Sequence, residues 1–265
     1  ARMCLMAKST NLTGSSQSLQ RGLDILMILD KAASPLGVRE IARQLDLSAT
    51  IVQRLVNTLA LNQFVTQDQE TRRYSIGYRA FGLGWSLTRK DRLISIAKSE
   101  LDMLASRYQL NGYLGMLRGA RAIYILSTQS EGPIVIRSVP GSETYLHSTA
   151  MGKVLLAALC DEEAEALLLR EPLEQVTPKT CTDPIILLDQ IREIRRQGHA
   201  TVIGENIPGV VSVGAPIRDA SQQTVAAVSA AFAEWAAPEF DIDKIIGLVK
   251  ESATRISRML GSQTE

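Results

Sequence analysis

Three polar side chains between residues 49 and 59 fall at a spacing that suits recognition of an extended partner. Thr50, Gln53 and Asn57 recur at i, i+3 and i+7, so a helix places them together on one face. Amide groups pair with the edge of adenine, and the guanidinium of the adjacent Arg54 pairs with guanine, in the major groove of DNA. This segment therefore predicts a DNA-recognition helix in which Gln53 and Arg54 are the strongest candidates for contacts with bases. The alternative role of Arg54 is a phosphate contact.

Apolar periodicity makes this helix the third of an N-terminal module. Helices are predicted at 19–33, 38–45 and 49–59, with a corner of about three residues between the second and third. The first helix rests on an apolar series at Leu19, Leu23, Leu26, Met27 and Leu29. Two short strands at 64–67 and 73–76 follow, separated by a polar turn. Three helices and a hairpin in this order predict a winged helix-turn-helix.

Further residues of this module are placed to contact a duplex. The Ser48 hydroxyl is the expected N-cap of the third helix, and Arg72 and Arg73 lie in the hairpin, where they would meet phosphates or the minor groove. Residues 1–88 carry ten Lys and Arg against six Asp and Glu, a net +4, whereas the remainder is −3. The alternative is a solvated helix face used for protein contacts. The predicted DNA-contacting residues are Ser48, Ala49, Thr50, Gln53, Arg54, Asn57, Arg72 and Arg73.

The composition of all 265 residues narrows the class of protein. Hydrophobic residues make up 45% and charged residues 22%, which is ordinary for a globular chain of two domains. No long apolar run or secretory signal is evident, so we expect a cytoplasmic protein without a membrane span. Three widely spaced cysteines and two histidines argue against a disulfide framework and a metal centre. We expect no metal and no cofactor.

The rest of the chain predicts an α+β domain with an antiparallel sheet. Strands are expected at 112–117, 122–128, 134–139, 201–216 and 224–232, and helices at 150–159, 162–170, 184–197 and 241–260. The resulting domains are a disordered tail at 1–17, a winged helix-turn-helix at 18–78, connecting helices at 79–107, and a C-terminal domain at 108–265.

Three stretches of the sequence resemble the isocitrate lyase regulator (IclR) family of bacterial transcription factors. They are residues 19–65, the small-residue loop and Gly-Lys helix HSTAMGKVLLA at 147–157, and the strand motif ENIPGVVSVGAPI at 205–217. The resemblance covers about residues 18 to 260. It implies a homodimer or homotetramer, in which a C-terminal domain similar to GAF folds binds a small metabolite and gates a catabolic operon. One difference is Ala49, at a position that is often basic in the family.

The resemblance also places an effector pocket in the C-terminal domain. The resemblance implies a pocket with three walls, formed by residues 150–152, by Val210 with Ser212, and by Ser229 with Ala231. His147 is a further candidate hydrogen-bond donor to the ligand. The expected effector-binding residues are His147, Ala150, Met151, Gly152, Val210, Ser212, Ser229 and Ala231.

The chemistry of these residues also favours ligand binding, independently of the resemblance. Ser148 or Thr149 would cap the helix from 150 and leave the amides of Met151 and Gly152 facing an anion. Ser212 and Ser229 interrupt apolar strands, where a ligand oxygen would satisfy their hydroxyls.

Each of these candidates has an alternative role that needs no ligand. The alternatives are a satisfied loop residue for His147, a solvated position for Lys153, neighbouring carbonyls for both serines, and a turn for Glu205 and Asn206. A pocket lined by small aliphatic residues and two hydroxyls suits a small ligand such as a hydroxy or oxo acid, an aldehyde or a sugar acid.

An enzyme is the less favoured class. The sequence has no P-loop, no GxGxxG between strand and helix, no HExxH and no GxSxG. We expect a ligand-responsive regulator, a repressor rather than an activator, that binds a pseudo-palindromic operator as a symmetric oligomer. The alternatives are an activator of the same architecture, a sensor that acts through protein partners, and a hydrolase or isomerase whose N-terminal helices only dimerise.

Overall fold

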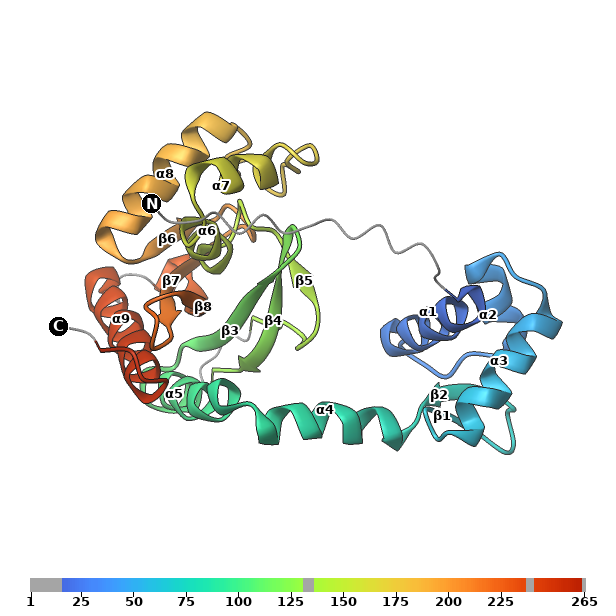
Figure 1. The fold of residues 1–265 in the computed structure, drawn as a ribbon. Helices are drawn as coiled ribbons and strands as arrows, with labels where there is room; N and C mark the ends of the chain where they lie inside the picture. The colour runs from blue at the N-terminus through green and yellow to red at the C-terminus, as the bar shows by residue number, and fades with distance from the viewer. Residues whose placement is uncertain (1–15, 131–135, 237–240, 264–265) are drawn as a thin grey trace. The chain divides into compact units, whose positions relative to one another are not determined.

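The chain folds into two compact units that divide between Lys90 and Asp91. The structure, a computed structural model, describes residues 16–130, 136–236 and 241–263 (Figure 1). The expected disordered tail at 1–17 lies almost wholly outside these residues, as does Cys4. Within the described ranges no helix is both long and apolar enough to cross a membrane.

The first unit is the winged helix-turn-helix predicted from the sequence. Its elements are α1 (Gln17–Lys31), α2 (Val38–Leu45), α3 (Ala49–Leu61), β1 (Val65–Gln67), β2 (Tyr74–Ile76) and α4 (Tyr78–Lys90). Ser48 is the N-cap of α3, because its hydroxyl accepts a hydrogen bond from the Ile51 amide at 3.3 Å. β1 and β2 pair antiparallel and form the wing.

A small apolar core holds this unit together, and α1 contributes only one of its two apolar faces to it. Ile25 and Leu29 are buried with Tyr74, Ile41, Val52, Val56 and Val65. The series Leu19, Leu23 and Met27 is exposed instead. The sequence pattern that predicted α1 therefore combined a core face with a second, solvent-facing apolar stripe.

The second unit is built on one antiparallel sheet, which confirms the predicted α+β class. The strand order is β5-β4-β3-β8-β7-β6. The strands are β3 (Asn111–Arg118), β4 (Arg121–Thr128), β5 (Glu143–Thr144), β6 (Ala200–Ile203), β7 (Val210–Arg218) and β8 (Thr224–Ala233). The stretch expected as one strand at 201–216 is two strands, because the chain turns at 204–209. Of the strand expected at 134–139, the first two residues lie outside the described ranges and 136–139 has no regular structure.

Helices cover both faces of this sheet (Figure 1). They are α5 (Arg92–Tyr108), α6 (Ala150–Ala157), α7 (Asp161–Leu168), α8 (Pro184–Gln197) and α9 (Ile242–Met259), with a short 3-10 helix at Glu234–Ala236. α5 and α9 pack on one face, and α6, backed by α7 and α8, packs on the other. Leu93, Ala97, Leu101 and Leu104 of α5 are buried in the core of the sheet. The second of the two expected connecting helices is thus part of the C-terminal core.

Candidate functional site

The exposed face of α3 carries the residues that were predicted to contact DNA. Val52 and Val56 are fully buried, and this orientation leaves Gln53, Arg54 and Asn57 in solvent. Ser48, Ala49 and Thr50 at the start of the helix are also exposed. The geometry therefore presents six of the eight predicted residues together on one accessible surface.

The two arginines of the wing differ in their surroundings. Arg72 is exposed in the turn between the strands, in the left-handed conformation with φ 57°. Arg73 instead binds both carboxylate oxygens of Glu40 at 2.9 and 3.0 Å and donates to the Pro35 carbonyl at 2.9 Å. The Gly37 amide, with Arg73, holds the pKa of Glu40 below its usual range. The expectation for Arg73 is corrected: its guanidinium ties β2 to α2 and is not a free phosphate ligand.

A cavity of about 350 Å³ lies in the second unit, on the α6 face of the sheet. The alternation of side chains along the strands explains its floor. Val213 of β7 and Ala230 of β8 point into the core against α5 and α9, so their neighbours Ser212 and Ser229 point to the opposite face. Tyr113 of β3 lies opposite Ser229 in the register and joins them.

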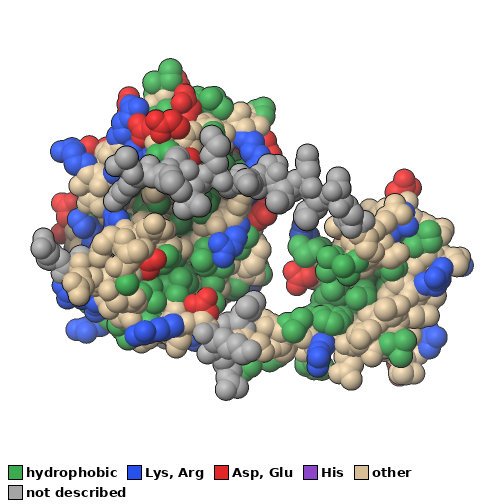
Figure 2. All heavy atoms as spheres, viewed as in Figure 1, with side chains coloured by type: hydrophobic (Ala, Val, Ile, Leu, Met, Phe, Trp, Pro, Cys, Tyr) green, Lys and Arg blue, Asp and Glu red, His purple; other side chains and the backbone are tan. Residues whose placement is uncertain are grey.

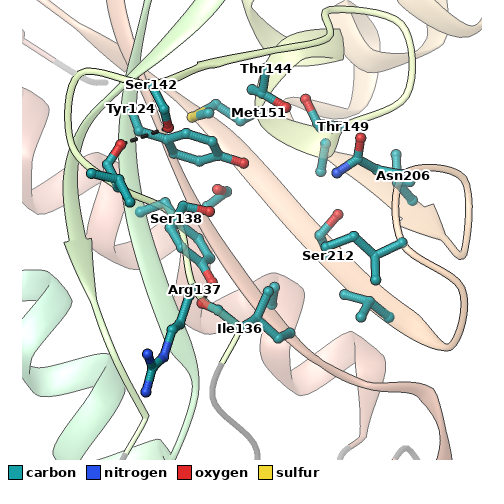
Figure 3. Close-up of a pocket in the computed structure, with 18 of the residues that line it drawn as sticks. Tyr124, Ile136, Arg137, Ser138, Ser142, Thr144, Thr149, Met151, Asn206 and Ser212 are labelled. Atoms are coloured by element: carbon teal, nitrogen blue, oxygen red, sulfur yellow. Dashed lines mark hydrogen bonds between the residues drawn. The ribbon is translucent and has the colours of Figure 1, made fainter. Parts of the chain in front are cut away.

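The walls of the cavity come from separate parts of the chain (Figure 3). Thr149 caps α6 and Ala150 and Met151 begin it, whereas Asn206 and Ile207 belong to the β6–β7 turn and Val210 begins β7. The segment before β5 supplies Ile136, Arg137, Ser138, Val139 and Ser142. Tyr124 and Ser138 lie across the cavity from Asn206 and Ser212 (Figure 3). Six of the eight predicted effector residues are therefore brought together at this cavity: Ala150, Met151, Val210, Ser212, Ser229 and Ala231.

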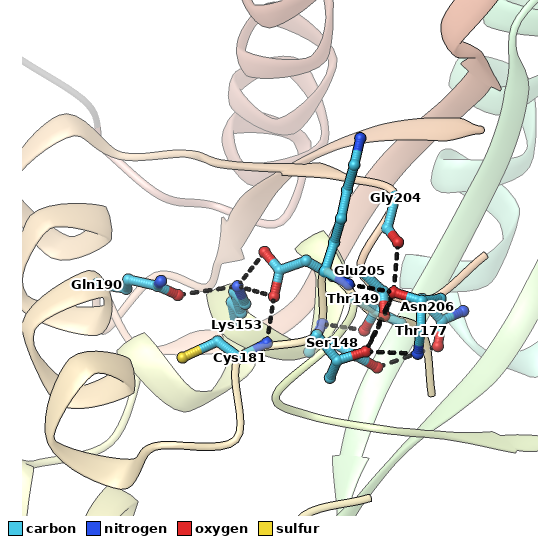
Figure 4. Close-up of polar contacts among 12 residues, drawn as sticks. Ser148, Thr149, Lys153, Thr177, Cys181, Gln190, Gly204, Glu205 and Asn206 are labelled. Carbon is cyan, nitrogen blue, oxygen red and sulfur yellow. Dashed lines mark hydrogen bonds and ion pairs between the residues drawn. The ribbon is translucent and has the colours of Figure 1, made fainter. Parts of the chain in front are cut away.

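Several polar groups line this cavity, and two of them, the hydroxyls of Ser212 and Ser229, have no partner among the described residues. Among the described residues no hydrogen bond is formed by the hydroxyls of Ser212 and Ser229, although Ser229 is only 4% exposed. The Ser148 hydroxyl donates to Asn206 Oδ1 at 3.0 Å (Figure 4), which fixes the amide and leaves its Nδ2 as a donor. Burial raises the pKa of Tyr113, whose hydroxyl donates to the Ile136 carbonyl at 2.5 Å. These groups offer a ligand neutral donors and acceptors.

One of the two main-chain amides expected to face an anion at the start of α6 already has a partner. The Gly152 amide donates to Thr149 Oγ1 at 2.9 Å, because Thr149 is the N-cap. A Cβ at Gly152 would lie 2.5 Å from the Tyr145 carbonyl oxygen. The prediction for Gly152 is wrong: its amide is used within the helix, and the glycine permits close packing against the preceding loop.

His147 also lies outside the cavity. Its Nε2 is 2.9 Å from the Glu174 carbonyl oxygen, and its ring packs against Tyr145 in a separate small cleft of about 60 Å³. Burial lowers the pKa of His147. The expected ligand role is corrected to that of a satisfied loop residue, the alternative considered above.

Lys153 is buried in a charged network behind the cavity (Figure 4). Its side chain is 3% exposed, and Nζ donates to the two carboxylate oxygens of Glu205 at 2.6 and 2.8 Å and to Gln190 Oε1 at 2.8 Å. The Thr177 and Thr180 hydroxyls donate to the main-chain carbonyls of the same turn. The alternative of a solvated Lys153 is wrong, because this pair joins α6 to the β6–β7 turn.

Sequence reasoning missed the aromatic wall and the segment before β5. Tyr113 and Tyr124 stand in ordinary strand patterns, and only the pairing of β3 with β8 brings Tyr113 beside Ser229. Asn206, whose alternative role is in a turn, belongs to both the turn and the cavity. In the described part of the chain no cluster of three His, Cys, Asp or Glu side chains could hold a metal ion.

Comparisons with known proteins agree with both units. Residues 86–258 match the family model "Bacterial transcriptional regulator IclR C-terminal", and residues 18–69 match "IclR helix-turn-helix domain". The chain is 30% identical over 217 residues to the HTH-type transcriptional regulator BhcR of Paracoccus denitrificans, covering 82% of this chain and 77% of that protein. It is 29% identical over 251 residues to the HTH-type transcriptional repressor AllR of Escherichia coli K12, covering 93% and 91%. The crystal structure of Thermotoga maritima IclR superposes with a TM-score of 0.78 at 30% identity, covering 92% and 98%.

Proposed function

The chain belongs to the IclR family of bacterial transcriptional regulators, and from that premise we propose that it represses a catabolic operon until a small sugar acid occupies the cavity of its C-terminal domain. The observation that carries the ligand assignment is the cavity floor, where the hydroxyls of Ser212 and Ser229 have no protein partner in the described chain. Both hydroxyls face the cavity, where a ligand oxygen can donate to them or accept from them.

The size and chemistry of the cavity favour the larger of the predicted ligand classes. Its volume of about 350 Å³ lies at the lower end of the range for small-molecule sites, roughly 300–1,000 Å³, and exceeds what a two- or three-carbon acid would fill. Its polar side chains are hydroxyls, one amide and the charged groups of Arg137 and Glu143, and the hydroxyls and the amide suit a chain of ligand hydroxyls. Arg137 is an exposed residue of the lining and is the cation that we propose for a ligand carboxylate; its guanidinium points away from the other lining side chains (Figure 3) and would turn inward on binding.

The DNA-binding role rests on the exposed face of α3. We assign base contacts to Thr50, Gln53, Arg54 and Asn57, and backbone contacts to Ser48, Ala49 and Arg72. Two-fold symmetry would place two such helices on the half-sites of a pseudo-palindrome. A ligand that binds two arrangements of the protein differently then changes the affinity for DNA by that difference.

We propose that exposed apolar side chains of the first unit form the subunit contact. Leu19, Leu23 and Met27 of α1 and Phe81 and Trp85 of α4 are between 48% and 69% exposed, and Figure 2 shows hydrophobic side chains on the surface of these helices. Phe81 and Trp85 stack with their ring centroids 6.0 Å apart. Large apolar side chains exposed on α1 and on α4 are candidates for protein–protein contacts.

The test combines DNA binding with a ligand screen on the full chain. We expect the protein to select one sequence from a pool of random duplexes, with an affinity that falls steeply as salt increases. Aldonic and 2-oxo sugar acids should raise its melting temperature, whereas benzoate, the size control, should not. A sugar acid that releases DNA supports a repressor, and one that strengthens binding supports the activator alternative. Conversion of the acid to a product would support the enzyme alternative, and failure to select DNA would support a sensor acting through protein partners.

A further inference from the structure

The phenol of Tyr74 connects the core of the first unit to the exposed face of α3. Tyr74 begins β2 and is 2% exposed, with its ring in the core beside Ile25 and Val56. Its backbone pairs with Leu36 through hydrogen bonds of 2.8 and 2.9 Å in both directions. Backbone and ring are thus fixed, and the hydroxyl, the one polar group of the side chain, has a defined position.

This hydroxyl contacts the side chain of Gln53, which otherwise stands in solvent. Gln53 Nε2 donates to the Tyr74 hydroxyl oxygen at 3.1 Å and to Asn57 Oδ1 at 2.8 Å. An exposed glutamine samples many rotamers, and ordering it on contact with DNA costs free energy. The hydrogen bond to the fixed phenol of Tyr74, together with the bond to the exposed Asn57, restricts those rotamers before DNA arrives.

The same contacts determine which group Gln53 presents to DNA. The amide nitrogen has two protons, and both are donated within the domain. Oε1 remains as an acceptor. In the major groove the donors that such an acceptor can bind are the N6 amino group of adenine and the N4 amino group of cytosine.

We propose that Tyr74 is a positioning residue for sequence recognition, whose buried phenol holds Gln53 so that its Oε1 accepts a hydrogen bond from the amino group of adenine or cytosine. This inference rests on the proposed DNA-binding function of α3 and adds to it a residue from the wing strand that does not itself touch the duplex.

Tyr74→Phe tests the proposal because it keeps the ring in the core and removes only the hydroxyl. The wild-type chain first selects a consensus from random duplexes, and Gln53→Ala identifies the base pair at which selectivity depends on Gln53. Tyr74→Phe should then lower the preference for the correct base at that pair about three- to tenfold, which is the range expected for one hydrogen bond. The double variant of Tyr74→Phe and Gln53→Ala should lose no more base preference than Gln53→Ala alone. Affinity for unrelated duplexes and the melting temperature should stay close to those of the wild type.

A matched control is Tyr108→Phe, which removes a phenol hydroxyl from α5 of the other unit. It should leave the preference unchanged. Wild-type selection with no consensus would contradict the proposed function itself. A consensus that Tyr74→Phe leaves intact while Gln53→Ala weakens it would overturn the positioning role. Replacing the adenine or cytosine of that base pair by an analogue without its exocyclic amino group should remove the Gln53-dependent preference, and a preference that survives this replacement would overturn the acceptor assignment.

Discussion

The hydroxyl of Ser229 offers the sharpest residue-scale test of the cavity. Ser229→Leu places a branched apolar side chain where the ligand oxygen would lie, on a floor shared with Tyr113 and Ser212. We expect the variant to bind DNA with wild-type affinity and to lose the thermal shift and the DNA response to the sugar acid. Ser106→Leu, an exposed position on α5, is the matched control and should respond normally. A Ser229→Leu protein that still responds would show that the ligand binds elsewhere.

The buried pair of Lys153 and Glu205 is expected to matter for stability. Lys153→Met leaves the Glu205 carboxylate, whose side chain is 15% exposed, without its cation. Removing one partner of a buried pair typically destabilises by about 3–5 kcal/mol, because the other charge remains desolvated. Denaturant unfolding should show this loss for Lys153→Met.

Two further variants distinguish that loss from a general effect of removing a lysine. Lys98→Met breaks an exposed pair with Asp102 and should cost at most about 1 kcal/mol. Adding Glu205→Leu to Lys153→Met should restore much of the stability, since no unpaired charge then remains. Equal losses for the two lysine variants would contradict a buried role for Lys153.

The surroundings of Lys153 show what residue types alone leave undetermined. A lysine in the first turn of a helix is usually solvated, and nothing near position 153 in the sequence indicates otherwise. Its partner Glu205 lies 52 residues later and approaches only because β6 and the following turn pack against α6. Burial of this kind depends on tertiary contacts that a single sequence does not reveal.

At the scale of elements, two helical glycines with opposite surroundings make a matched pair. A methyl group at Gly152 would meet the Tyr145 and Leu146 backbone at 2.5–2.6 Å, whereas one at Gly247 in α9 would meet nothing within 4 Å. Gly152→Ala should therefore destabilise by about 1–3 kcal/mol through overpacking. Gly247→Ala should stabilise by up to about 1 kcal/mol, since alanine is the better helix former. Comparable melting temperatures for the two variants would contradict the close approach at α6.

Elements with local start and stop residues were predictable, and those defined by their partners were not. α8 matches its predicted range 184–197, because Asp183 caps it, Pro184 begins it and Gly198 ends it in the left-handed conformation. The apolar run before β5 resembled a strand, yet 136–139 has no ladder partner and forms a cavity wall instead. Hydrogen-bond partners decide whether an apolar run is a strand, and the sequence does not name them.

The candidate site also contains residues that the sequence predicts and residues that only the folded structure brings together. The strand serines were predictable because a hydroxyl in an apolar strand is conspicuous, and the family motifs gave their order. The hydroxyls of Tyr113 and Tyr124, however, face the cavity only because β3 lies between β4 and β8. On α3 the exposed face followed from helical periodicity, whereas the contact of Gln53 with Tyr74 crosses 21 residues and needed the folded wing.

At the scale of the whole molecule, the function requires communication between two units with separate cores. The N-terminal core and the two cores of the second unit share no residues. In the oligomer that we propose, a ligand in the C-terminal cavity would alter DNA binding by changing how subunits associate or how their half-site helices are spaced. The exposed apolar side chains of α1 and α4 are the surface through which we expect this association to occur.

Phe81→Glu tests that surface. The side chain is 69% exposed, so a carboxylate there costs the isolated chain little, but in a subunit contact it would be buried without a partner charge. We expect light scattering to give an oligomeric mass for the wild type and a lower one for Phe81→Glu, down to a single chain if the contact is the dimer. Binding to a palindromic operator should weaken to that of one half-site. Leu169→Glu, which is 63% exposed in the second unit, should keep the wild-type mass. If Phe81→Glu also keeps that mass, the subunit contact lies on another surface.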